Sequence, residues 1–284
     1  MHNSMKRQCK TLYVSDLDGT LLNLQSRVSS FTASVLNRLI ADGMLFSIAT
    51  ARTPATVVAL MDAVEMRLPV VLMTGALTYD LRSHEYLSAS FFRCEAVRRI
   101  VDVLLQKDLS PMIYYLNGSL LHVAYRRPLS AAQEKFVAER TGSPYKRFIE
   151  ITRYDVLPDN TILVFCMGEY DKLCTAYEAV ASLPGHESYL YRDIADSCMG
   201  YLEIYPAATT KAAAIERLAQ VAGADEIVVF GDNRNDIPMF EVASRSYAVE
   251  NAVAETKACA TGIIGSNDTD GVARFLLQEW GVKL

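Results

Sequence analysis

The segment Leu12-Tyr13-Val14-Ser15-Asp16-Leu17-Asp18-Gly19-Thr20 places two acidic residues directly after a short apolar run. A run of this kind predicts a buried strand, and residues i and i+2 of a strand share a face. We therefore expect Asp16 and Asp18 to start out on the same side, at the carboxyl end of the strand, where open α/β sheets place their chemistry. Two carboxylates this close repel each other, and a divalent cation or a shared proton relieves the repulsion.

Strands and helices alternate toward both ends of the chain. Short apolar runs predict strands at residues 12–14, 45–49, 69–73, 226–230 and 247–249. Amphipathic runs predict helices at residues 31–42, 53–65, 211–222 and 272–279. Ser30 is the expected N-cap of the first helix and Gly43 its stop, while Thr53-Pro54 is a cap followed by proline at the first helical position. Near-continuous apolar strands alternating with helices indicate a parallel sheet that is covered on both faces.

The middle of the chain has a different pattern. It predicts helices at 94–107, 130–140 and 170–182, and strands at 112–116, 120–124, 161–167, 188–192 and 200–205. Asn117-Gly118 lies between two of these strands and suits the type I′ turn of a hairpin. We expect an α/β fold with a Rossmann-like parallel-sheet core built from residues 1–82 and 207–284. An α+β module with antiparallel strands, residues 83–206, is expected to be inserted between the two halves.

Composition and charge exclude several classes of function. The 284 residues carry a formal net charge of −5 without a block of lysine or arginine, so nucleic acid is not an expected partner. No apolar run is long enough to cross a bilayer, and Met1–Arg7 has no apolar segment behind it. We therefore expect no membrane span and no signal peptide, and a cytoplasmic protein. The six cysteines form no CxxC pair and the four histidines share no helical spacing, which favours reduced thiols and argues against a histidine zinc site.

Further groups of polar residues follow predicted strands or begin predicted helices. Thr50-Ala51-Arg52 lies between a strand and the next helix, Lys211 opens its helix, and Gly231-Asp232-Asn233-Arg234-Asn235-Asp236 follows another strand. Asp232 adds a third carboxylate, and hard oxygen ligands of this kind suit Mg²⁺. A hydroxyl, backbone amides and a helix N-terminus around Thr50 make a cradle for phosphate, to which Lys211 adds a positive charge.

Together these groups are suited to phosphoryl transfer. One carboxylate near a metal can attack phosphorus and form an aspartyl-phosphate, and the second can protonate the leaving oxygen and then activate water. Each group alone has a plainer interpretation. The aspartate pair could be a solvated turn, Thr50 a helix cap, Lys211 a surface lysine, and the last segment a turn or a weak calcium loop. Their occurrence together, in this order on an α/β pattern, favours a catalytic site.

These motifs resemble those of the haloacid dehalogenase-like hydrolase superfamily, in particular its Cof-type phosphatase branch, over nearly the whole chain. The resemblance implies that Asp16 is the nucleophile, Asp18 the general acid/base and Lys211 the catalytic lysine. It implies that Mg²⁺ is the cofactor, held by the Asp16 side chain, the Asp18 backbone carbonyl and Asp232. It also implies that Asp236 supports the metal-binding residues without binding the metal itself.

The same resemblance implies a set of phosphate-binding residues. Thr50 matches the threonine of the second family motif, and it is expected to hold phosphate with Ala51, Arg52, Lys211 and Asn235. The family usually has glycine where this chain has Ala51, and the extra methyl restricts the loop.

The chain departs from the family pattern in two other loops. Thr74-Gly75-Ala76 replaces the usual Asn-Gly-Ala, and Ala207-Ala208-Thr209-Thr210 precedes the lysine where glycine and serine are common. We expect these changes to affect substrate preference more than activity. The insertion lies between Thr50 of the second family motif and Lys211 of the third, and its order of elements is similar to the α/β type-two cap of the family. Such a cap would close over the substrate, and the residues of it that could face the cleft are Tyr114, Tyr115, His122, Tyr189, Tyr191 and Arg192.

The sequence therefore predicts a Mg²⁺-dependent phosphatase of small phosphorylated metabolites, such as sugar phosphates, that works through an aspartyl-phosphate. One alternative is a sugar phosphomutase or phosphotransferase, in which a sugar hydroxyl takes the phosphoryl group. Another is a metabolite-binding protein without catalytic activity. A true dehalogenase lacks the second aspartate, and a P-type ATPase needs membrane helices. The expected partner is a small phosphorylated metabolite, and the oligomeric state is left open.

Overall fold

The computed structural model describes residues 9–155, 157–193 and 196–282, and their contacts divide the chain into two compact units. The first unit is Met1–Leu87 with Thr210–Leu284, and the second is Ser88–Thr209. The expectation about a signal peptide concerned Met1–Arg7, which lies outside the described residues. Within the described part of the chain, no helix combines the length and the apolar character that crossing a membrane requires.

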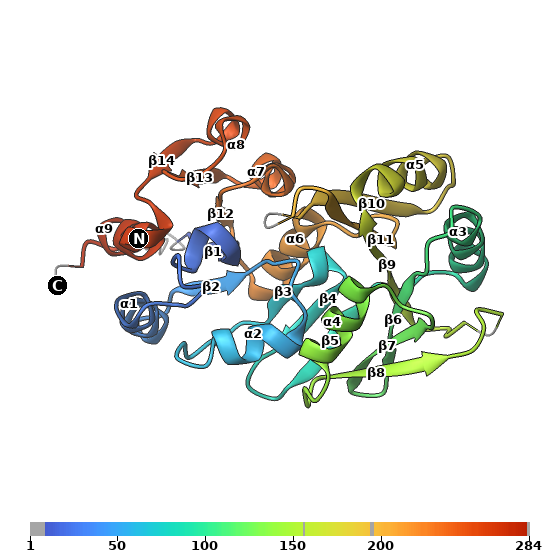
Figure 1. Ribbon diagram of the computed structural model, residues 1–284. Helices are drawn as coiled ribbons and strands as arrows, with labels where there is room; N and C mark the ends of the chain where they lie inside the picture. The colour runs from blue at the N-terminus through green and yellow to red at the C-terminus, as the bar shows by residue number, and fades with distance from the viewer. Residues whose placement is uncertain (1–8, 156, 194–195, 283–284) are drawn as a thin grey trace, which may run out of the picture. The chain divides into compact units, whose positions relative to one another are not determined.

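The first unit contains a parallel five-stranded sheet in the order β14-β13-β12-β1-β2 (Figure 1). Its strands are β1 (Thr11–Ser15), β2 (Leu45–Ile48), β12 (Glu226–Gly231), β13 (Arg245–Val249) and β14 (Gly262–Ile264). Its helices are α1 (Ser30–Ala41), α2 (Pro54–Leu60), α6 (Lys211–Ala222), α7 (Ile237–Val242), α8 (Ala254–Cys259) and α9 (Gly271–Glu279). Helix α1 packs beside α9, and α6 beside α7. The predicted α/β class with a parallel-sheet core is confirmed.

The expected third core strand, β3 (Val70–Leu72), belongs mainly to a smaller sheet. It pairs antiparallel with β4 (Leu77–Asp80), and β5 (Glu85–Ala89) lies on the other side of β4. One parallel bridge, between Ala49 and Val71, connects β3 to the end of β2. Strands β4 and β5 were not predicted from the sequence.

The N-cap expected for one helix and the C-terminal end expected for another are wrong. Helix α1 begins at Ser30, and its N-cap is Ser29 instead, because the extended Ser29 accepts a hydrogen bond from the amide of Thr32 at 2.9 Å. Helix α2 ends at Leu60 rather than near residue 65. The reason lies in α1, where the Asn37 amide group bonds the carbonyl of Ala63 and the N–H of Glu65 at 2.9 and 2.7 Å. These backbone groups are satisfied outside a helix, so the helix does not continue.

The second unit contains a six-stranded sheet in the order β10-β11-β9-β6-β7-β8. Its strands are β6 (Met112–Asn117), β7 (Leu120–Arg126), β8 (Lys146–Ile151), β9 (Thr161–Glu169), β10 (His186–Arg192) and β11 (Met199–Pro206). Its helices are α3 (Cys94–Gln106), α4 (Ala131–Arg140) and α5 (Tyr170–Ala181). Neighbouring strands are antiparallel as expected, except that the unpredicted β8 runs parallel to β7.

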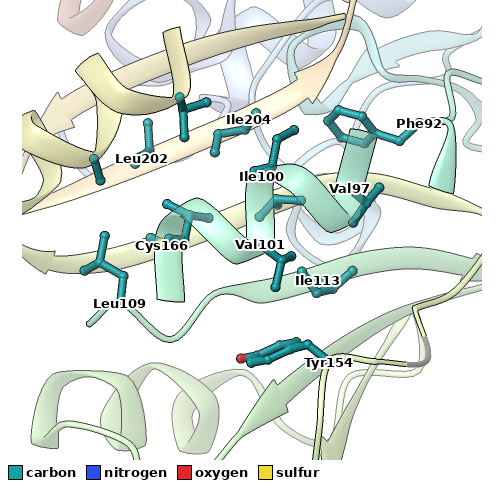
Figure 2. Close-up of a cluster of buried hydrophobic side chains, with 14 of the residues drawn as sticks. Phe92, Val97, Ile100, Val101, Leu109, Ile113, Tyr154, Cys166, Leu202 and Ile204 are labelled. Carbon is teal, nitrogen blue, oxygen red and sulfur yellow. The ribbon is translucent and has the colours of Figure 1, made fainter. Parts of the chain in front are cut away.

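The core of the second unit lies between its sheet and helices α3 and α5. Figure 2 shows Val97, Ile100 and Val101 of α3 facing Ile113 and Cys166 of the sheet. The β6–β7 hairpin differs by one residue from the prediction, because Asn117 still pairs with Leu120. The turn is therefore Gly118-Ser119, with Gly118 at a φ of 61°.

Candidate active site

The motif residues gather at the carboxyl ends of the parallel strands. Strand β1 lies between β2 and β12, with Ser15 in register with Ile48 and Phe230. The residues that follow these strands are therefore neighbours, and the amide of Asp16 donates to the carbonyl of Phe230 at 2.9 Å. The strand order thus brings Asp16, Thr50 and the segment 231–236 to one edge of the sheet.

Lys211 is buried between two carboxylates. Its Nζ donates to Oδ1 of Asp16 and to Oδ1 of Asp236, both at 2.7 Å, and 1% of its side chain is exposed. Lys211 is the first residue of α6, whose N-cap Thr210 accepts from the amide of Ala213 at 3.1 Å. The start of this helix therefore fixes the backbone of Lys211, and the two carboxylates hold its Nζ.

Asp236 uses both carboxylate oxygens within the protein. Oδ1 accepts from Lys211, and Oδ2 accepts from the backbone amides of Asp232 and Asn233 at 3.0 and 3.2 Å. A Cβ at Gly231 would lie 2.7 Å from the Cβ of Asp236, so glycine is needed for this close approach. Asp236 therefore orders the turn after β12.

Asp16 and Asp232 keep one carboxylate oxygen each for a ligand. Thr20 donates its hydroxyl to Oδ1 of Asp232 at 3.1 Å, and Lys211 occupies Oδ1 of Asp16. The described residues donate no hydrogen bond to the two Oδ2 atoms. Carboxylate oxygens of Asp16, Asp232 and Asp236 all lie within 4.8 Å of one another. Such an all-oxygen donor set fits a hard divalent cation.

The charges of this cluster also favour a cation. Burial, together with the charge of Asp236, raises the pKa of Asp16 to about 8 despite the opposing effect of Lys211. Burial and Asp236 likewise raise the pKa of Asp232 to about 6. Burial would lower the pKa of Lys211, but Asp16 and Asp236 raise it above its ordinary value. Three carboxylates face one ammonium group, so a divalent cation would neutralise the excess negative charge.

Asp18 lies in a different environment from Asp16. Strand β1 ends at Ser15, so the strand alternation does not extend to the two aspartates, and Asp18 belongs to a wide turn over Leu17–Leu21. Gly19 in this turn has a φ of 72°. The Asp18 side chain is 53% exposed and is bound by Arg52. The two carboxylates therefore have different cationic partners, Lys211 for Asp16 and Arg52 for Asp18.

The loop after β2 is held by its own backbone. The amide of Thr50 donates to Val71 at 3.0 Å, and its carbonyl accepts from Thr74 at 3.1 Å. Its hydroxyl accepts from the amide of Arg52 at 3.2 Å, which leaves the hydroxyl proton to donate elsewhere. Ala51 is not at a positive φ, so the methyl group that replaces the family glycine causes no backbone strain. The expected phosphate cradle is thus ordered, although the Arg52 guanidinium is bound to Asp18.

Two further residues near this loop were singled out from the sequence, Asn235 as a phosphate ligand and Thr74 as a departure from the family pattern. Asn235 lies in the turn Arg234–Asp236, and its side-chain amide has no hydrogen bond to any described residue. Thr74, noted only as a departure from the family pattern, is 3% exposed at a φ of 57°. The Thr74 hydroxyl is buried without a hydrogen-bond partner among the residues that the structure describes. Buried polar groups without a hydrogen-bond partner are uncommon, and so is a positive φ at a β-branched residue, so Thr74 is an unusual feature of this region.

Asn251 was missed from the sequence. Its amide nitrogen donates to the carbonyl of Gly19 at 2.7 Å, and its amide oxygen accepts from Asn267 at 3.0 Å. It thereby supports the wide turn that carries Asp18. A signal was present, because Asn251 follows β13 closely at the same edge of the sheet.

The residues that were expected to be able to face the cleft contact one another or neighbours within the second unit. These contacts join Tyr114 with Phe165, Tyr115 with His122, Tyr189 with Tyr191, and Arg192 with Tyr170. Which of them meets a substrate stays a prediction.

Comparisons with known proteins agree with this geometry. A family model described as haloacid dehalogenase-like hydrolase matches residues 13–276. The chain belongs to this hydrolase family. The 5-amino-6-(5-phospho-D-ribitylamino)uracil phosphatase YwtE of Bacillus subtilis (strain 168) is 30% identical over 276 residues, which cover 93% of this chain and 96% of the relative. A crystal structure of a haloacid dehalogenase-like hydrolase from Bacteroides thetaiotaomicron has a TM-score of 0.76 at 23% identity, covering 95% of this chain and 99% of that one.

A second haloacid dehalogenase-like hydrolase, from B. subtilis, has a TM-score of 0.73 at 20% identity and covers 93% of this chain and 98% of that one. Membership of the family confirms the resemblance drawn from the motifs, and the chain is a hydrolase of the phosphatase type. Phosphatases of this family generally use a divalent metal, for which the acidic cluster offers a site.

Proposed function

We propose that this haloacid dehalogenase-like phosphatase hydrolyses small phosphorylated metabolites, such as sugar phosphates, with Mg²⁺ and through an aspartyl-phosphate on Asp16. The observation that carries the proposal is the buried cluster in which Lys211 donates to Asp16 and Asp236 at 2.7 Å each. It holds one carboxylate in place beside a cation, as a nucleophile requires. The name of the relative YwtE specifies a phosphorylated ribityl compound, which supports a small phosphorylated metabolite as substrate.

The reaction has two steps. In the first, an Asp16 carboxylate oxygen bonds to phosphorus, the bond from phosphorus to the leaving oxygen breaks, and Asp18 gives that oxygen its proton. In the second, a water oxygen bonds to phosphorus, the bond between Asp16 and phosphorus breaks, and Asp18 takes a proton from the water. Asp16 and Asp18 thus return to their starting states, and inorganic phosphate is released.

The remaining residues neutralise and hold the phosphoryl group. Lys211 supplies a positive charge beside Asp16, while the Thr50 hydroxyl, the Ala51 amide and Asn235 bind phosphoryl oxygens. Asp16, the backbone carbonyl of Asp18 and Asp232 would hold Mg²⁺, which supplies positive charge for the phosphoryl oxygens when bound. The second unit, Ser88–Thr209, is proposed to act as the cap that selects the leaving group.

Phosphate release from a panel of phosphorylated metabolites, with and without Mg²⁺, tests the proposal. The panel includes sugar phosphates and the phosphorylated ribityl compound named for YwtE. Asp16→Asn is expected to lower kcat on the order of 10³-fold or more, because the amide is a poor nucleophile. Removing Mg²⁺ with a chelator is expected to abolish turnover, and adding it back to restore the rate.

The matched control is Asp42→Asn, the same change at the exposed C-cap of α1, which should leave the rate unchanged. Turnover that survives Asp16→Asn would contradict the nucleophile. Transfer of phosphate to an added sugar instead of water would indicate a phosphotransferase, and binding of metabolites without turnover would indicate a binding protein.

A further inference from the structure

We propose that Arg52 is the positioning residue of Asp18, acting on the proton transfers rather than on the phosphoryl group. The inference rests on the proposed function, because it gives Arg52 a part in the same reaction. Its basis is a two-pronged ion pair. The guanidinium donates from Nε to Oδ2 of Asp18 at 2.7 Å and from Nη2 to Oδ1 at 2.6 Å. Paired contacts of this kind fix the orientation of a carboxylate as well as its charge.

The site gives each reacting carboxylate its own cation. Lys211 is buried and bound to the buried Asp16, whereas the side chains of Arg52 and Asp18 are 29% and 53% exposed. Both members of the second pair therefore remain accessible to water and to a leaving group. The Nε and Nη2 edge of the guanidinium is engaged with both oxygens of Asp18 and so is directed at this carboxylate rather than at a phosphate.

The backbone on both sides of this ion pair is fixed. The Arg52 amide donates to the Thr50 hydroxyl at 3.2 Å, and its carbonyl accepts from the amide of Met73 at 3.1 Å. On the other side, a Cβ at Gly19 would lie 2.5 Å from Oδ2 of Asp232, so the turn that carries Asp18 packs tightly on the acidic cluster. With the backbone held, what remains free is rotation of the half-exposed Asp18 side chain, and Arg52 restricts it.

The pairing leaves Asp18 able to move a proton. A carboxylate has about four lone-pair positions, and the guanidinium uses one on each oxygen. A proton on a free position can pass to the leaving oxygen as the bond between phosphorus and that oxygen breaks. The same position can then accept a proton from water as the water oxygen bonds to phosphorus. Arg52 therefore stays bound through both steps, and its contribution is orientation.

Esters with different leaving groups distinguish positioning from phosphate binding. The 4-nitrophenolate group leaves without a proton, whereas an alkyl alkoxide needs the proton of Asp18. For the alkyl ester that the wild type cleaves best, Arg52→Ala is expected to lower kcat about 10- to 100-fold with KM changed less than about 3-fold. With 4-nitrophenyl phosphate, Arg52→Ala should leave the rate of the first step unchanged. It should slow the second step, in which Asp18 takes a proton from water. A burst of about one nitrophenolate per enzyme should precede a slow steady state.

A double-mutant cycle shows whether Arg52 acts through Asp18. Added to Asp18→Asn, Arg52→Ala is expected to lower the alkyl-ester rate no further. Arg52→Lys keeps the charge but not the paired contact, and should fall between wild type and Arg52→Ala. The control is Arg82→Ala, which removes an exposed ion pair with Asp80 in the same unit and should leave both rates unchanged. Thermal melts show whether each variant is folded. If Arg52→Ala is not folded, Arg52→Lys replaces it in the test.

Other outcomes would overturn the inference. Additive losses in the cycle would show that Arg52 acts independently of Asp18. Equal rises in KM for both esters, with weaker inhibition by inorganic phosphate and no burst, would assign Arg52 to phosphate binding. In both cases Asp16→Asn would still abolish turnover, and the proposed function would stand. If Asp16→Asn stayed active, the proposed function would fail, and this inference with it.

Discussion

At the scale of single residues, Thr74 combines two unusual features, a positive φ and a buried hydroxyl without a partner among the described residues. A β-branched residue at a φ of 57° is strained by about 1–2 kcal/mol. Asparagine tolerates this backbone region far better. We therefore expect Thr74→Asn to raise the free energy of unfolding of the first unit by about 1 kcal/mol. Urea denaturation followed by fluorescence of Trp280, the single tryptophan of the chain, measures the change.

The control for this change is Thr78→Asn in β4, where the backbone is extended and asparagine has no such advantage. Equal effects at positions 74 and 78 would show that strain at Thr74 is not what the substitution relieves. A loss of stability at position 74 alone would show that packing of the threonine outweighs the strain.

Single residues also mark the limit of what the sequence predicts about the site. The meeting of Asp16 and Asp232 was predictable, because residues that follow parallel strands share an edge of the sheet. Lys211 begins a helix instead, and its place in the site was expected from the family resemblance. The bond between Arg52 and Asp18 was not, since it depends on where β1 ends and on the turn that follows. The positive φ of Thr74 was equally hidden, because threonine gives no signal for that conformation.

At the scale of secondary-structure elements, α6 shows what a capping residue does for the site. The Thr210 hydroxyl accepts from the amide of Ala213 at 3.1 Å and so fixes the first turn, which carries Lys211. Thr210→Ala is expected to lower the free energy of unfolding of the first unit by about 1 kcal/mol, because a helix amide loses its partner. Urea denaturation measures the loss, and Thr210→Ser should restore most of it. If alanine and serine behaved alike at position 210, the capping hydrogen bond would not be what stabilises the helix.

Elements with local signals at both ends were predicted best. The range expected for α6 matches the structure, since Thr210 begins the helix and Gly223, at a φ of 65°, ends it. Helix α2 was predicted too long because Asn37, from another helix, bonds the backbone after it. Strand β8 was missed because its half-exposed residues show no regular alternation, and its order comes from pairing with β7.

At the scale of the whole molecule, the chain forms two units, of which the second has a core of its own around α3, α5 and its sheet. Their stabilities can be followed separately, because Trp280 reports on the first unit while far-ultraviolet circular dichroism reports on both. One group, Glu203, should give the second unit a pH dependence of its own. Burial raises the pKa of Glu203 on β11 to about 7, although Tyr205 donates to its Oε2 at 3.1 Å.

Among the described residues, the titratable groups around Glu203 are tyrosines, and no ion pair joins its carboxylate to a cation. Tyr205 lies on the same strand, Tyr189 is its partner on β10, and the charge of Glu203 raises the pKa of Tyr114 in turn. Since the folded unit binds this proton more tightly than the unfolded chain, the stability that it contributes is full below pH 4.5. It is then lost as the pH rises to about 7.

We expect Glu203→Gln to remove this dependence while keeping an oxygen for Tyr205. The stability advantage of the glutamine variant should therefore grow between pH 5 and pH 8, by at most about 3 kcal/mol. Urea denaturation at both pH values measures it as the difference between variant and wild type, in which the titration of all other groups cancels. The exposed Glu95 on α3 provides the control, because Glu95→Gln should show no such growth. A constant difference across the pH range would mean that Glu203 is ionised as readily in the folded unit as in water.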